Sequence, residues 1–499
     1  MSLLSINFLY TALLAVLIFY AIPRKWQSGF LLILSLLFFT LAGPVYLPLI
    51  FLLTMADFKL ALRMKSATPN RRKKLLWLGL LLNVGMLLFF KYVFLVNILL
   101  CTFLPHLGST FSAFSDNLLV PLGLSYFIFK KISYLLDCYW GRLQPEVRFA
   151  RLLLYVVFFP EITAGPIDRA GRLLPQFAES KYFNRLNISI GLHQILWGLI
   201  KKLVIADRLA VLINPVFKQP EHYQAQVIIT AILLFSIQIY SDFSGYSDIA
   251  IGLGRLFGYR LQMNFDRPYF ALSISDFWTR WHISLSQWLR DYLFLPLSFS
   301  FLRRFPEIRI IGLKTEMFAY AYASLITMAL CGLWHGSAWT FLFWGLLHGI
   351  YLIGGYFTRR GRRLLKKKLG LANHSALNRS WQRLVTFLLV SLSWIFFKSA
   401  SLSGAFFIFK RLFTPANWFA GKSVGLTALS SAAGKVEFAV AFGVALLLFS
   451  VEKIQGHIRI GHFIRSLKLP FRWAIYYLVI LAILFFGMFV SGEFVYQGF

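Results

Sequence analysis

The sequence predicts an all-α integral membrane protein whose chain crosses the bilayer many times. Of its 499 residues, 58% are hydrophobic and only 14% are charged, whereas charged residues make up about a quarter of an ordinary soluble domain. The mean hydropathy is +0.68, and the apolar residues gather in runs close to the roughly 20 residues that a membrane helix needs. A membrane-spanning β-barrel would show shorter segments of alternating polarity instead.

Apolar runs recur along the whole chain, separated by short polar or basic segments. We interpret them as about eleven to thirteen membrane segments, since the second run is long enough for two helices. They cover residues 5–22, 29–56, 75–104, 118–137, 188–215, 226–240, 317–333, 337–357, 384–398, 435–451 and 472–494. The longest polar stretches, at about 358–383 and 105–117, are too short for a soluble domain, so residues 1–499 are expected to form a single membrane domain.

The first apolar run predicts the orientation of the chain. No Lys or Arg precedes it, and Arg24 and Lys25 follow it, which argues against a cleavable signal peptide. The positive-inside rule then places the N-terminus outside the cytoplasm. The same rule places the cluster 71–74 inside and residues 105–117, which lack Lys and Arg, outside.

The net charge of +32 arises from 51 basic and 19 acidic residues. A nucleic-acid-binding protein would gather this charge on one face, but here it lies in short clusters between apolar runs, the largest from Arg359 to Lys368. We therefore expect no nucleic-acid partner. The clusters are typical of membrane topology and of attraction to anionic lipid; the alternative is a docking surface for an acidic cytoplasmic partner.

Residues 152–159 form an apolar run that is too short to cross a membrane and is stopped by Pro160. Basic residues flank this region on both sides, which suggests that both of its ends are cytoplasmic. The segment EITAGPIDR at 161–169 would then dip into the membrane and return. Irregular backbone at that depth survives only when it is buried in protein or lines a wet cavity, so this segment is a candidate cavity wall.

Residues 273–294 have the pattern of an amphipathic helix that lies in the membrane interface. A polar stripe at helical spacing is formed by Arg280, Ser284, Gln287 and Asp291. His282 lies about 200° around such a helix from Arg280, at about 100° per residue. We therefore expect His282 to point into the protein, away from the wet side.

Two further histidines, His335 and His348, lie in an almost wholly apolar stretch at residues 332–349. Ionisable residues in membrane segments are costly and usually face an internal path or cavity. Gly332 and Gly336 are expected to leave open space beside His335, with Trp334 and Trp339 as a rigid wall. Desolvation would keep the ring neutral, so that it can act as a base toward a hydroxyl; the alternative is a hydrogen-bonded core histidine.

His348 lies 13 residues after His335, about 220° around the axis if the chain is one helix. The two rings would then not share a face, and we interpret His348 as structural.

The segment YSDFSGYSD at residues 240–248 ends a long apolar run and has two interpretations. Its serines and aspartates could form a polar network that orients a catalytic group or the substrate. Alternatively, the segment is a helix stop with an N-cap, with Gly245 as the breaker. Asp242 and Asp248 are too few for a hard-metal site, which needs six or more oxygen ligands.

Several classes of site have no signature in this sequence. The three cysteines, Cys101, Cys138 and Cys331, are an odd and scattered set, which indicates neither a disulfide framework nor a zinc site. No HExxH, P-loop, strand-associated GxGxxG or GxSxG motif occurs. We therefore expect no zinc, nucleotide or serine-triad chemistry.

A resemblance to a known family rests on six motifs in the expected order. They are PLGLSYFIFKKISYLLD (121–137), FPEITAGP (159–166), YSDFSGYSD (240–248), RWHISLSQWLRDYL (280–293), GLWHG (332–336) and SWIFF (393–397). Together they resemble the membrane-bound O-acyltransferases, and in particular the bacterial branch that contains alginate O-acetyltransferase and teichoic-acid D-alanyltransferase. The combination of DFWTRWHIS with GLWHG about fifty residues later is the most specific part, whereas SWIFF alone is weak.

The resemblance implies a ring of helices, with re-entrant and interfacial segments, around a central funnel in the bacterial cytoplasmic membrane. An acyl thioester would enter from the cytoplasm, and the acyl group would reach a hydroxyl of an exported envelope or secreted polysaccharide. The acceptor would be a polysaccharide or a lipid-linked glycan. A separate extracytoplasmic acyltransferase is the implied partner for the last step.

The resemblance also implies roles for residues. The essential histidine of the family corresponds to His335, expected as general base or proton carrier toward the acceptor hydroxyl. Its second histidine corresponds to His282, which would orient the thioester or stabilise the oxyanion. No metal is implied. Supporting pocket residues are expected at Asp242, Ser244, Asp248, Trp281, Arg280, Asp276, Trp334, Asp168 and Arg169.

Two acyl groups remain open within the branch. The GPIDR segment at 165–169 is more similar to the D-alanyltransferases, which take D-alanine from a phosphopantetheine carrier protein. The chain length and the run at 280–292 are more similar to the acetyltransferases, which implies acetyl-CoA as donor. We favour acetyl transfer.

Two functions from other classes are also considered. One is a transporter or flippase with buried histidines in a proton relay, although the paired broken helices of inverted repeats are not evident. The other is a degenerate scaffold, against which the retention of both His282 and His335 argues.

Overall fold

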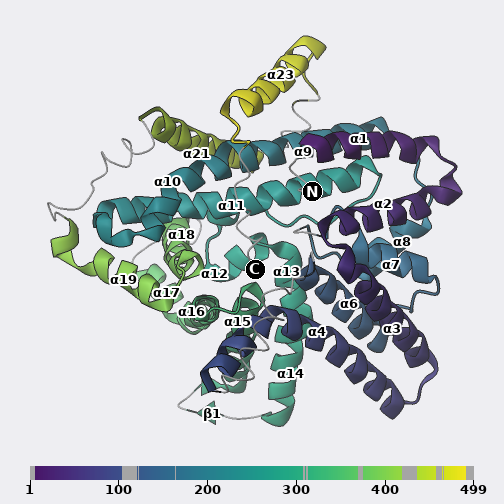
Figure 1. The fold of residues 1–499 in the computed structure, drawn as a ribbon. Coiled ribbons are helices and arrows are strands. Elements are labelled where there is room, and N and C mark those ends of the chain that lie inside the picture. The colour runs from purple at the N-terminus through teal and green to yellow at the C-terminus, as the bar shows by residue number, and fades with distance from the viewer. Residues whose placement is uncertain are drawn as a thin grey trace. The chain divides into compact units, whose positions relative to one another are not determined.

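The computed structural model describes residues 6–103, 121, 123–162, 165–306, 309–310, 313–368, 375–418, 435–456, 464 and 466–489. Within these ranges the chain is almost entirely helical (Figure 1). The strands found there are two residues long each, β1 (Arg309–Ile310) and β2 (Leu313–Lys314), and they pair antiparallel. The prediction of an all-α protein is confirmed.

Eight helices in the described part of the chain are long and apolar enough to cross a membrane. They are Pro44–Ser66, Pro69–Val93, Ala225–Leu256, Thr315–His335, Trp339–Phe357, Ala376–Lys398, Phe438–Gln455 and Leu469–Phe486. A shorter apolar helix covers Tyr10–Ala21. A multi-pass membrane protein is therefore confirmed, while the total of about eleven to thirteen segments stays a prediction. The predicted outer loop at 105–117 lies outside the described residues.

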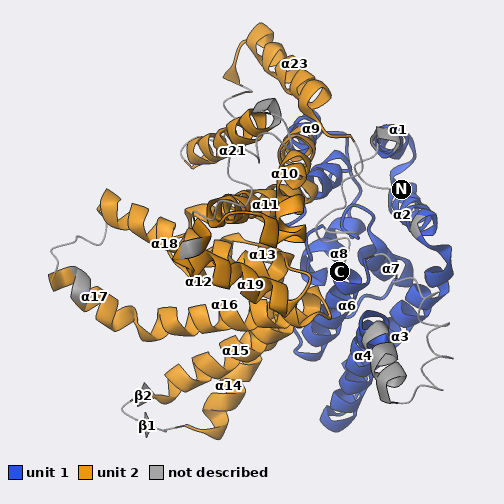
Figure 2. Cartoon of the chain, turned by 60° about the vertical axis from the view of Figure 1, so that its left-hand side comes forward, with its two compact units in different colours: residues 1–195, 249–263 blue, residues 196–248, 264–499 orange. Residues whose placement is uncertain are grey.

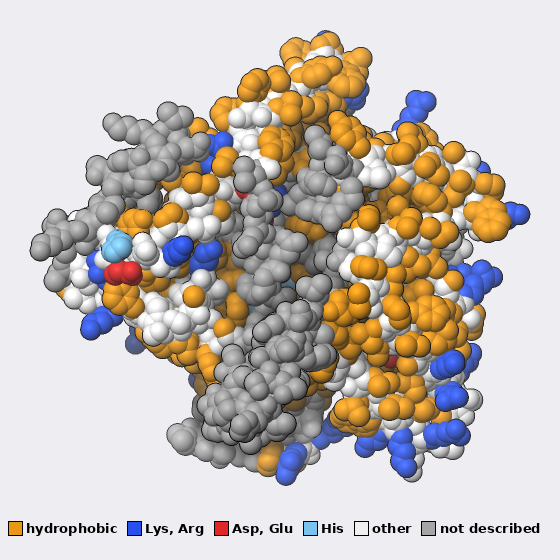
Figure 3. All heavy atoms as spheres, viewed as in Figure 1, with side chains coloured by type: hydrophobic (Ala, Val, Ile, Leu, Met, Phe, Trp, Pro, Cys, Tyr) orange, Lys and Arg blue, Asp and Glu red, His pale blue; other side chains and the backbone are white. Residues whose placement is uncertain are grey.

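Hydrophobic side chains cover much of the outside of the helices, as expected where the solvent is lipid. Large apolar residues such as Leu17, Leu41, Leu81 and Phe485 are more exposed than buried. The space-filling view in Figure 3 shows hydrophobic side chains spread over the surface, and the Lys and Arg side chains gathered mainly toward its margins.

The described chain forms two compact units (Figure 2), and each is described by itself. Unit 1 consists of residues 1–195 and 249–263, and unit 2 of residues 196–248 and 264–499. The chain passes from one unit to the other within helix α9 (Arg185–Leu199), within helix α11 (Ala225–Leu256) and between Met263 and Asn264. The single membrane domain expected for residues 1–499 stays a prediction.

Unit 1 contains the N-terminal helices. They are α1 (Ile6–Ala21), α2 (Gln27–Ala42), α3 (Leu47–Ser66), α4 (Pro69–Phe103), α6 (Leu124–Tyr139), α7 (Phe149–Val157) and α8 (Ala170–Ala178). The run at 29–56 forms two helices, as predicted, because Gly43 and Pro44 separate α2 from α3. Helix α7 has nine residues, so it rises only about 14 Å and cannot cross the bilayer.

Among the described residues, unit 2 holds the helices that follow, besides its parts of α9 and α11 and three short 3-10 helices. They are η3 (Ile200–Ala206), α10 (Asp207–Lys218), α12 (Ile274–Arg280), α13 (Ile283–Leu289), η6 (Arg290–Phe294), α14 (Leu295–Arg304), α15 (Thr315–His335), α16 (Trp339–Phe357), α17 (Arg359–Lys368), α18 (Ala376–Lys398), α19 (Leu402–Phe413), α21 (Lys435–Gln455) and α23 (Leu469–Phe486). Both η3 and η6 are π-helical turns, a rare geometry that often marks functional sites.

Helices α15 and α16 form a tight pair. The single helix considered for residues 335–348 is wrong, because α15 ends at His335 and Gly336 is fully extended. A Cβ at Gly332 would lie 2.2 Å from the backbone oxygen of Phe341. Only glycine therefore permits this approach of α15 to α16, and the tight pair fixes the position of His335 at the end of α15.

Candidate active site

His335 lies inside unit 2 with 3% of its surface exposed. Its ring contacts Trp334, Trp344 and Phe397 with centroid separations of 4.8, 5.2 and 5.4 Å. Aromatic rings in edge contact at such distances hold one another firmly. The imidazole is thus fixed in an apolar, aromatic environment.

The expected surroundings of His335 were wrong in two details. Trp339 is 70% exposed and forms no wall, and Trp344 of α16 and Phe397 of α18 take that place. Gly332 and Gly336 do not leave open space either, because a Cβ at Gly336 would lie 2.2 Å from the Phe341 ring. Both glycines serve close packing between helices.

His282 is completely buried, as predicted, but not on one face of a continuous helix. It separates α12 from α13 and has the left-handed backbone φ 43°, ψ 54°. This conformation costs a non-glycine residue roughly 1–2 kcal/mol. The hydrogen bond from the Ile283 amide to the Asn264 carbonyl, at 2.8 Å, holds the break. The polar stripe is therefore also wrong, and Ser284 is buried.

The His282 ring lies between two aromatic side chains of unit 2. The centroid of Phe243 lies 4.6 Å away and that of Trp334 lies 6.2 Å away, both in edge contact. The indole of Trp334 therefore contacts both His282 and His335. Burial lowers the pKa of His282 to about 3, because an apolar environment disfavours the charged imidazolium. The structure brings the two predicted histidines around one indole.

Asn264 makes the polar contacts of the His282 side chain. Its Oδ1 lies 3.3 Å from His282 Nδ1 and accepts from the Ser284 hydroxyl at 2.7 Å. Its Nδ2 donates to Ser247 Oγ at 3.2 Å. Asn264 was missed in the sequence, where an asparagine between helices has no signal of its own.

The YSDFSGYSD segment does not stop a helix, since α11 continues through it to Leu256. Gly245 is no breaker: a Cβ there would lie 2.8 Å from the Gly198 oxygen and 3.0 Å from the Lys202 nitrogen. The glycine allows α11 to pack closely against η3. Ser247 reaches Asn264, so this segment belongs to a polar network that ends at His282.

Two buried lysines of η3 pair with the aspartates of this segment. Lys202 Nζ lies 2.7 Å from Asp242 and 2.8 Å from Asp207. Lys201 pairs with Asp248 and donates to Ser244 Oγ at 3.0 Å. These ion pairs compensate the cost of charge in an apolar environment. The sequence signal for this ionic cluster is the Lys-Lys pair inside the apolar run 188–215.

Three predicted residues near His282 have structural contacts. Arg280 Nε lies 2.7 Å from Asp276 Oδ1, one helical turn apart on α12. Trp281 is buried between Phe277 and Trp394, at centroid distances of 5.5 and 5.1 Å. This ion pair and these ring contacts fix α12 next to the histidine.

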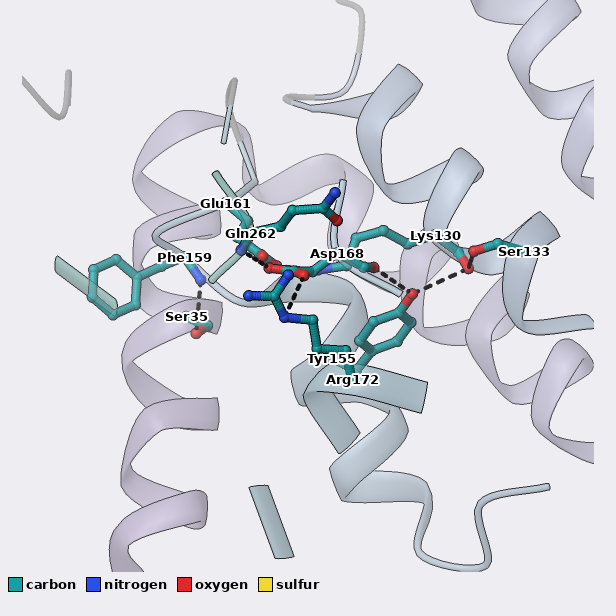
Figure 4. A network of polar contacts seen from close by, with 9 residues as sticks. All are labelled: Ser35, Lys130, Ser133, Tyr155, Phe159, Glu161, Asp168, Arg172 and Gln262. Carbon is teal, nitrogen blue, oxygen red and sulfur yellow. Dashed lines mark hydrogen bonds and ion pairs between the residues drawn. The ribbon is translucent and has the colours of Figure 1, made fainter. Parts of the chain in front are cut away.

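Asp168 and Arg169 belong to unit 1. Asp168 is buried, accepts from the Gln262 amide at 2.9 Å and lies 3.6 Å from Arg172 Nε (Figure 4). Arg169 is the N-cap residue of α8 and is half-buried. The described residues of the predicted dip are irregular and mostly buried, and Glu161 pairs with the buried Lys130. Residues 163–164 lie outside the described part.

His348 is also fully buried. Its Nε2 lies 2.9 Å from Ser393 Oγ on α18, and its ring packs against Trp344 and Trp278 at 5.0 and 5.2 Å. These contacts join α16 to α18 and α12, which fits the structural interpretation.

This arrangement is suited to proton transfer and hydrogen bonding in a dry environment. Two buried imidazoles contact one indole, and ion pairs and amide contacts hold the nearby backbone. No group of three or more His, Cys, Asp or Glu side chains with metal-binding geometry occurs among the described residues.

Comparison with known proteins shows which family this chain is similar to. The family model for membrane-bound O-acyltransferases matches residues 142–397, a range that contains both histidines. The chain is 35% identical to a peptidoglycan O-acetyltransferase of Helicobacter pylori, over 78% of this chain and 73% of that one. It is 31% identical to a probable alginate O-acetylase of Azotobacter vinelandii, over 80% and 75%. It is 29% identical to a teichoic acid D-alanyltransferase of Bacillus subtilis, over 47% and 59%.

Proposed function

Because the chain belongs to the membrane-bound O-acyltransferase family and is an O-acyltransferase, we propose that it transfers acetyl groups to an exported glycan. The donor is acetyl-CoA, bound from the cytoplasm. The acceptor is a hydroxyl of a cell-envelope or secreted polysaccharide. The site is the pair His335 and His282, and the protein lies in the bacterial cytoplasmic membrane with its N-terminus outside.

One observation carries the acyl-transfer chemistry: His282 and His335 are buried around the same Trp334 indole, inside the region that matches the family model. Buried ionisable groups in a membrane protein are costly and are retained where they have a function. Packing alone gives no reason to place two such costly side chains beside the same indole, so we assign them a function.

The proposed reaction uses His335 as general base. Its neutral imidazole accepts the proton of the acceptor hydroxyl while the hydroxyl oxygen bonds to the thioester carbonyl carbon. The carbon–sulfur bond then breaks, and the imidazolium returns its proton to the leaving thiolate. His282 either orients the thioester or stabilises the oxyanion. The aromatic walls exclude water, which limits hydrolysis of the thioester.

The choice of an acetyl group rests on the relatives. The two acetylating relatives align over about three quarters of both chains, and their names specify glycan acceptors. The basic clusters of the chain suit an anionic donor such as acetyl-CoA. We further propose a separate extracytoplasmic acyltransferase as partner, which completes transfer to the polymer.

D-alanyl transfer from a carrier protein to a teichoic-acid-like polymer is the second candidate. It is favoured by GPIDR at 165–169 and by D-alanyltransferase relatives that align over 47% and 52% of this chain. These alignments are shorter than those of the acetylating relatives, which is why acetyl transfer ranks first.

The experiment is a transfer assay with membrane vesicles from cells that express the chain together with the proposed extracytoplasmic partner. Acetyl-CoA labelled in the acetyl group is supplied with a de-esterified glycan, and both CoA release and label on the glycan are measured. We expect both in the wild type and neither in His335→Ala. Activity only with a D-alanyl carrier protein would favour the second candidate, and no thioester turnover with either donor would favour transport.

The matched control is Ser391→Ala. This variant also removes a buried polar group of unit 2, whose hydroxyl contacts Ser236 at 2.9 Å, but it touches neither histidine in the described contacts. It should retain activity, which separates a chemical defect from a general loss of packing.

A further inference from the structure

The hydrogen bonds of Asn264 determine which nitrogen of His282 carries a proton. Three groups surround its side-chain oxygen: Ser284 Oγ at 2.7 Å, the Ser284 amide nitrogen at 3.3 Å and His282 Nδ1 at 3.3 Å. Its amide nitrogen faces Ser247 Oγ at 3.2 Å. All of these residues belong to unit 2 and are buried.

The backbone amide of Ser284 fixes the orientation of the Asn264 side chain. A backbone N–H can only donate, so the atom that it faces must be the amide oxygen. Rotating the side chain by 180° would place two donors against each other and leave the Ser284 amide without an acceptor. Burial makes such a mismatch costly, about 1–3 kcal/mol.

The fixed oxygen then selects the tautomer of His282. An amide oxygen has no proton to give, so the contact with Nδ1 is a hydrogen bond only if Nδ1 carries the proton. The other tautomer would set two lone pairs against each other. It would also leave a buried Nε2–H without an acceptor, since no hydrogen-bond partner of Nε2 exists in the described part of the chain.

We propose that Asn264 is a positioning residue that holds His282 as the Nδ1–H tautomer, so that Nε2 accepts a hydrogen bond from an N–H or O–H group of the substrate. This inference rests on the proposed function and sharpens it. A nitrogen with a lone pair cannot donate to an oxyanion. Of the two roles expected for His282, the inference therefore favours orienting the thioester over stabilising the oxyanion.

The environment keeps His282 neutral. The low pKa of about 3 arises from burial, opposed only by a contact with the residue's own backbone. A ring that stays neutral keeps the lone pair of Nε2 available to accept a hydrogen bond. The proposed reaction assigns proton transfer to His335, so the two histidines have different tasks beside Trp334.

The variant Asn264→Asp tests this inference through the pH profile. The carboxylate still accepts from Nδ1–H, but its negative charge should raise the pKa of His282 by about 1–3 units. The neutral acceptor form then exists only above the raised pKa, so activity is lost as the pH falls through it. The ratio of variant to wild-type rate should fall about tenfold per pH unit below that value.

A purely structural Asn264 predicts another result. The ratio of the Asn264→Asp rate to the wild-type rate would then be the same at every pH. Such a constant ratio would overturn the inference. Ser391→Ala is again the control, with a profile parallel to the wild type. Michaelis constants for acetyl-CoA and for the glycan, measured at a pH where the variant is half-protonated, decide which of them provides the N–H or O–H group.

A direct measurement keeps the inference testable if Asn264→Asp does not fold. The wild-type protein is labelled with ¹⁵N-histidine, and the His282 signals are assigned by their loss in His282→Gln. We expect a protonated Nδ1 and an unprotonated Nε2; a protonated Nε2 would overturn the inference. Because this readout needs no activity, its failure is distinguishable from failure of acetyl transfer, which leaves the wild type inactive in the transfer assay.

Discussion

His282 and His348 are equally buried in unit 2, yet their hydrogen bonds are opposite. At His348 the outer nitrogen, Nε2, contacts Ser393 Oγ at 2.9 Å, and that hydroxyl donates to the Val390 carbonyl at 2.7 Å. The serine therefore accepts, and His348 carries its proton on Nε2. At His282 the inner nitrogen, Nδ1, contacts Asn264, and Nε2 has no partner among the described residues.

The difference shows how a structural and a functional histidine can be told apart at equal burial. In a structural histidine, the atom at the tip of the ring is satisfied by the protein and joins two helices. In His282, which we assign to function, the protein holds the inner nitrogen and leaves the tip for a ligand, whereas in His348 it is the inner Nδ1 that has no partner among the described residues. The strained backbone of His282 points the same way, since such strain gathers at functional sites.

The largest effect on activity is expected at His335, which contacts the same indole as His282. His335→Ala should lower the transfer rate by about 10²–10⁴-fold, the usual contribution of a general base. The label transferred from acetyl-CoA measures this, with thermal unfolding as the control for folding. Normal transfer by a folded His335→Ala protein would show that His335 is not the general base.

The largest effect on stability is expected at Lys202, which helps to hold α11 and, through Ser247, Asn264. Lys202→Met should cost about 3–5 kcal/mol, because Asp242 and Asp207 would be left buried without their cation. The midpoint of unfolding in detergent measures the loss. Lys201→Met is the matched comparison. Since its partner Asp248 is 20% exposed, the loss of stability should be smaller. An equal loss would contradict the claim that the cost depends on how deeply the unpaired carboxylate is buried.

His348→Phe should reduce stability by about 1–3 kcal/mol, since the Ser393 hydroxyl loses its donor inside the α16–α18 contact. Its transfer rate, measured at a temperature where the variant is folded, should stay near that of the wild type. A large loss of rate without a loss of stability would show that His348 is not the structural member of the pair.

Of the two histidine variants expected to lower the transfer rate, His282→Ala should have the smaller effect. His282→Ala removes one hydrogen bond to the substrate and should lower activity about tenfold, in line with a net contribution of about 1–1.5 kcal/mol. The rate is measured at a temperature where the variant is folded, because truncation of a buried ring also costs stability. If the rate is unchanged while stability falls, His282 and His348 are alike and the contrast between them has no functional meaning.

The helical class, the membrane location and the burial of His282 and His335 could all be predicted from the sequence. Long apolar runs and rare polar residues within them are local signals, and they need no knowledge of tertiary contacts. The break at His282 could not be predicted, because it depends on the carbonyl of Asn264, 18 residues away. The helical spacing of the surrounding residues indicated a continuous helix instead.

The roles of two glycines and of a lysine pair could not be predicted either, because they also depend on tertiary contacts. Gly245 and Gly332 look like breakers or spacers in the sequence, but they are places where two helices meet at backbone distance. Lys201 and Lys202 interrupt an apolar run, and only the fold shows that three aspartates pair with them. A lysine pair inside an apolar run is a signal of a buried ionic cluster, to be weighed like a histidine.

One measurement tests the proposed acetyl transfer most directly. Envelope and secreted glycans are taken from cells that express the native chain and from cells that express His335→Ala, and their esters are released with mild base and identified by mass spectrometry. We predict that acetate is lost in the variant while other esters are unchanged. Loss of D-alanine instead, or no change at all, would contradict acetyl transfer by this histidine.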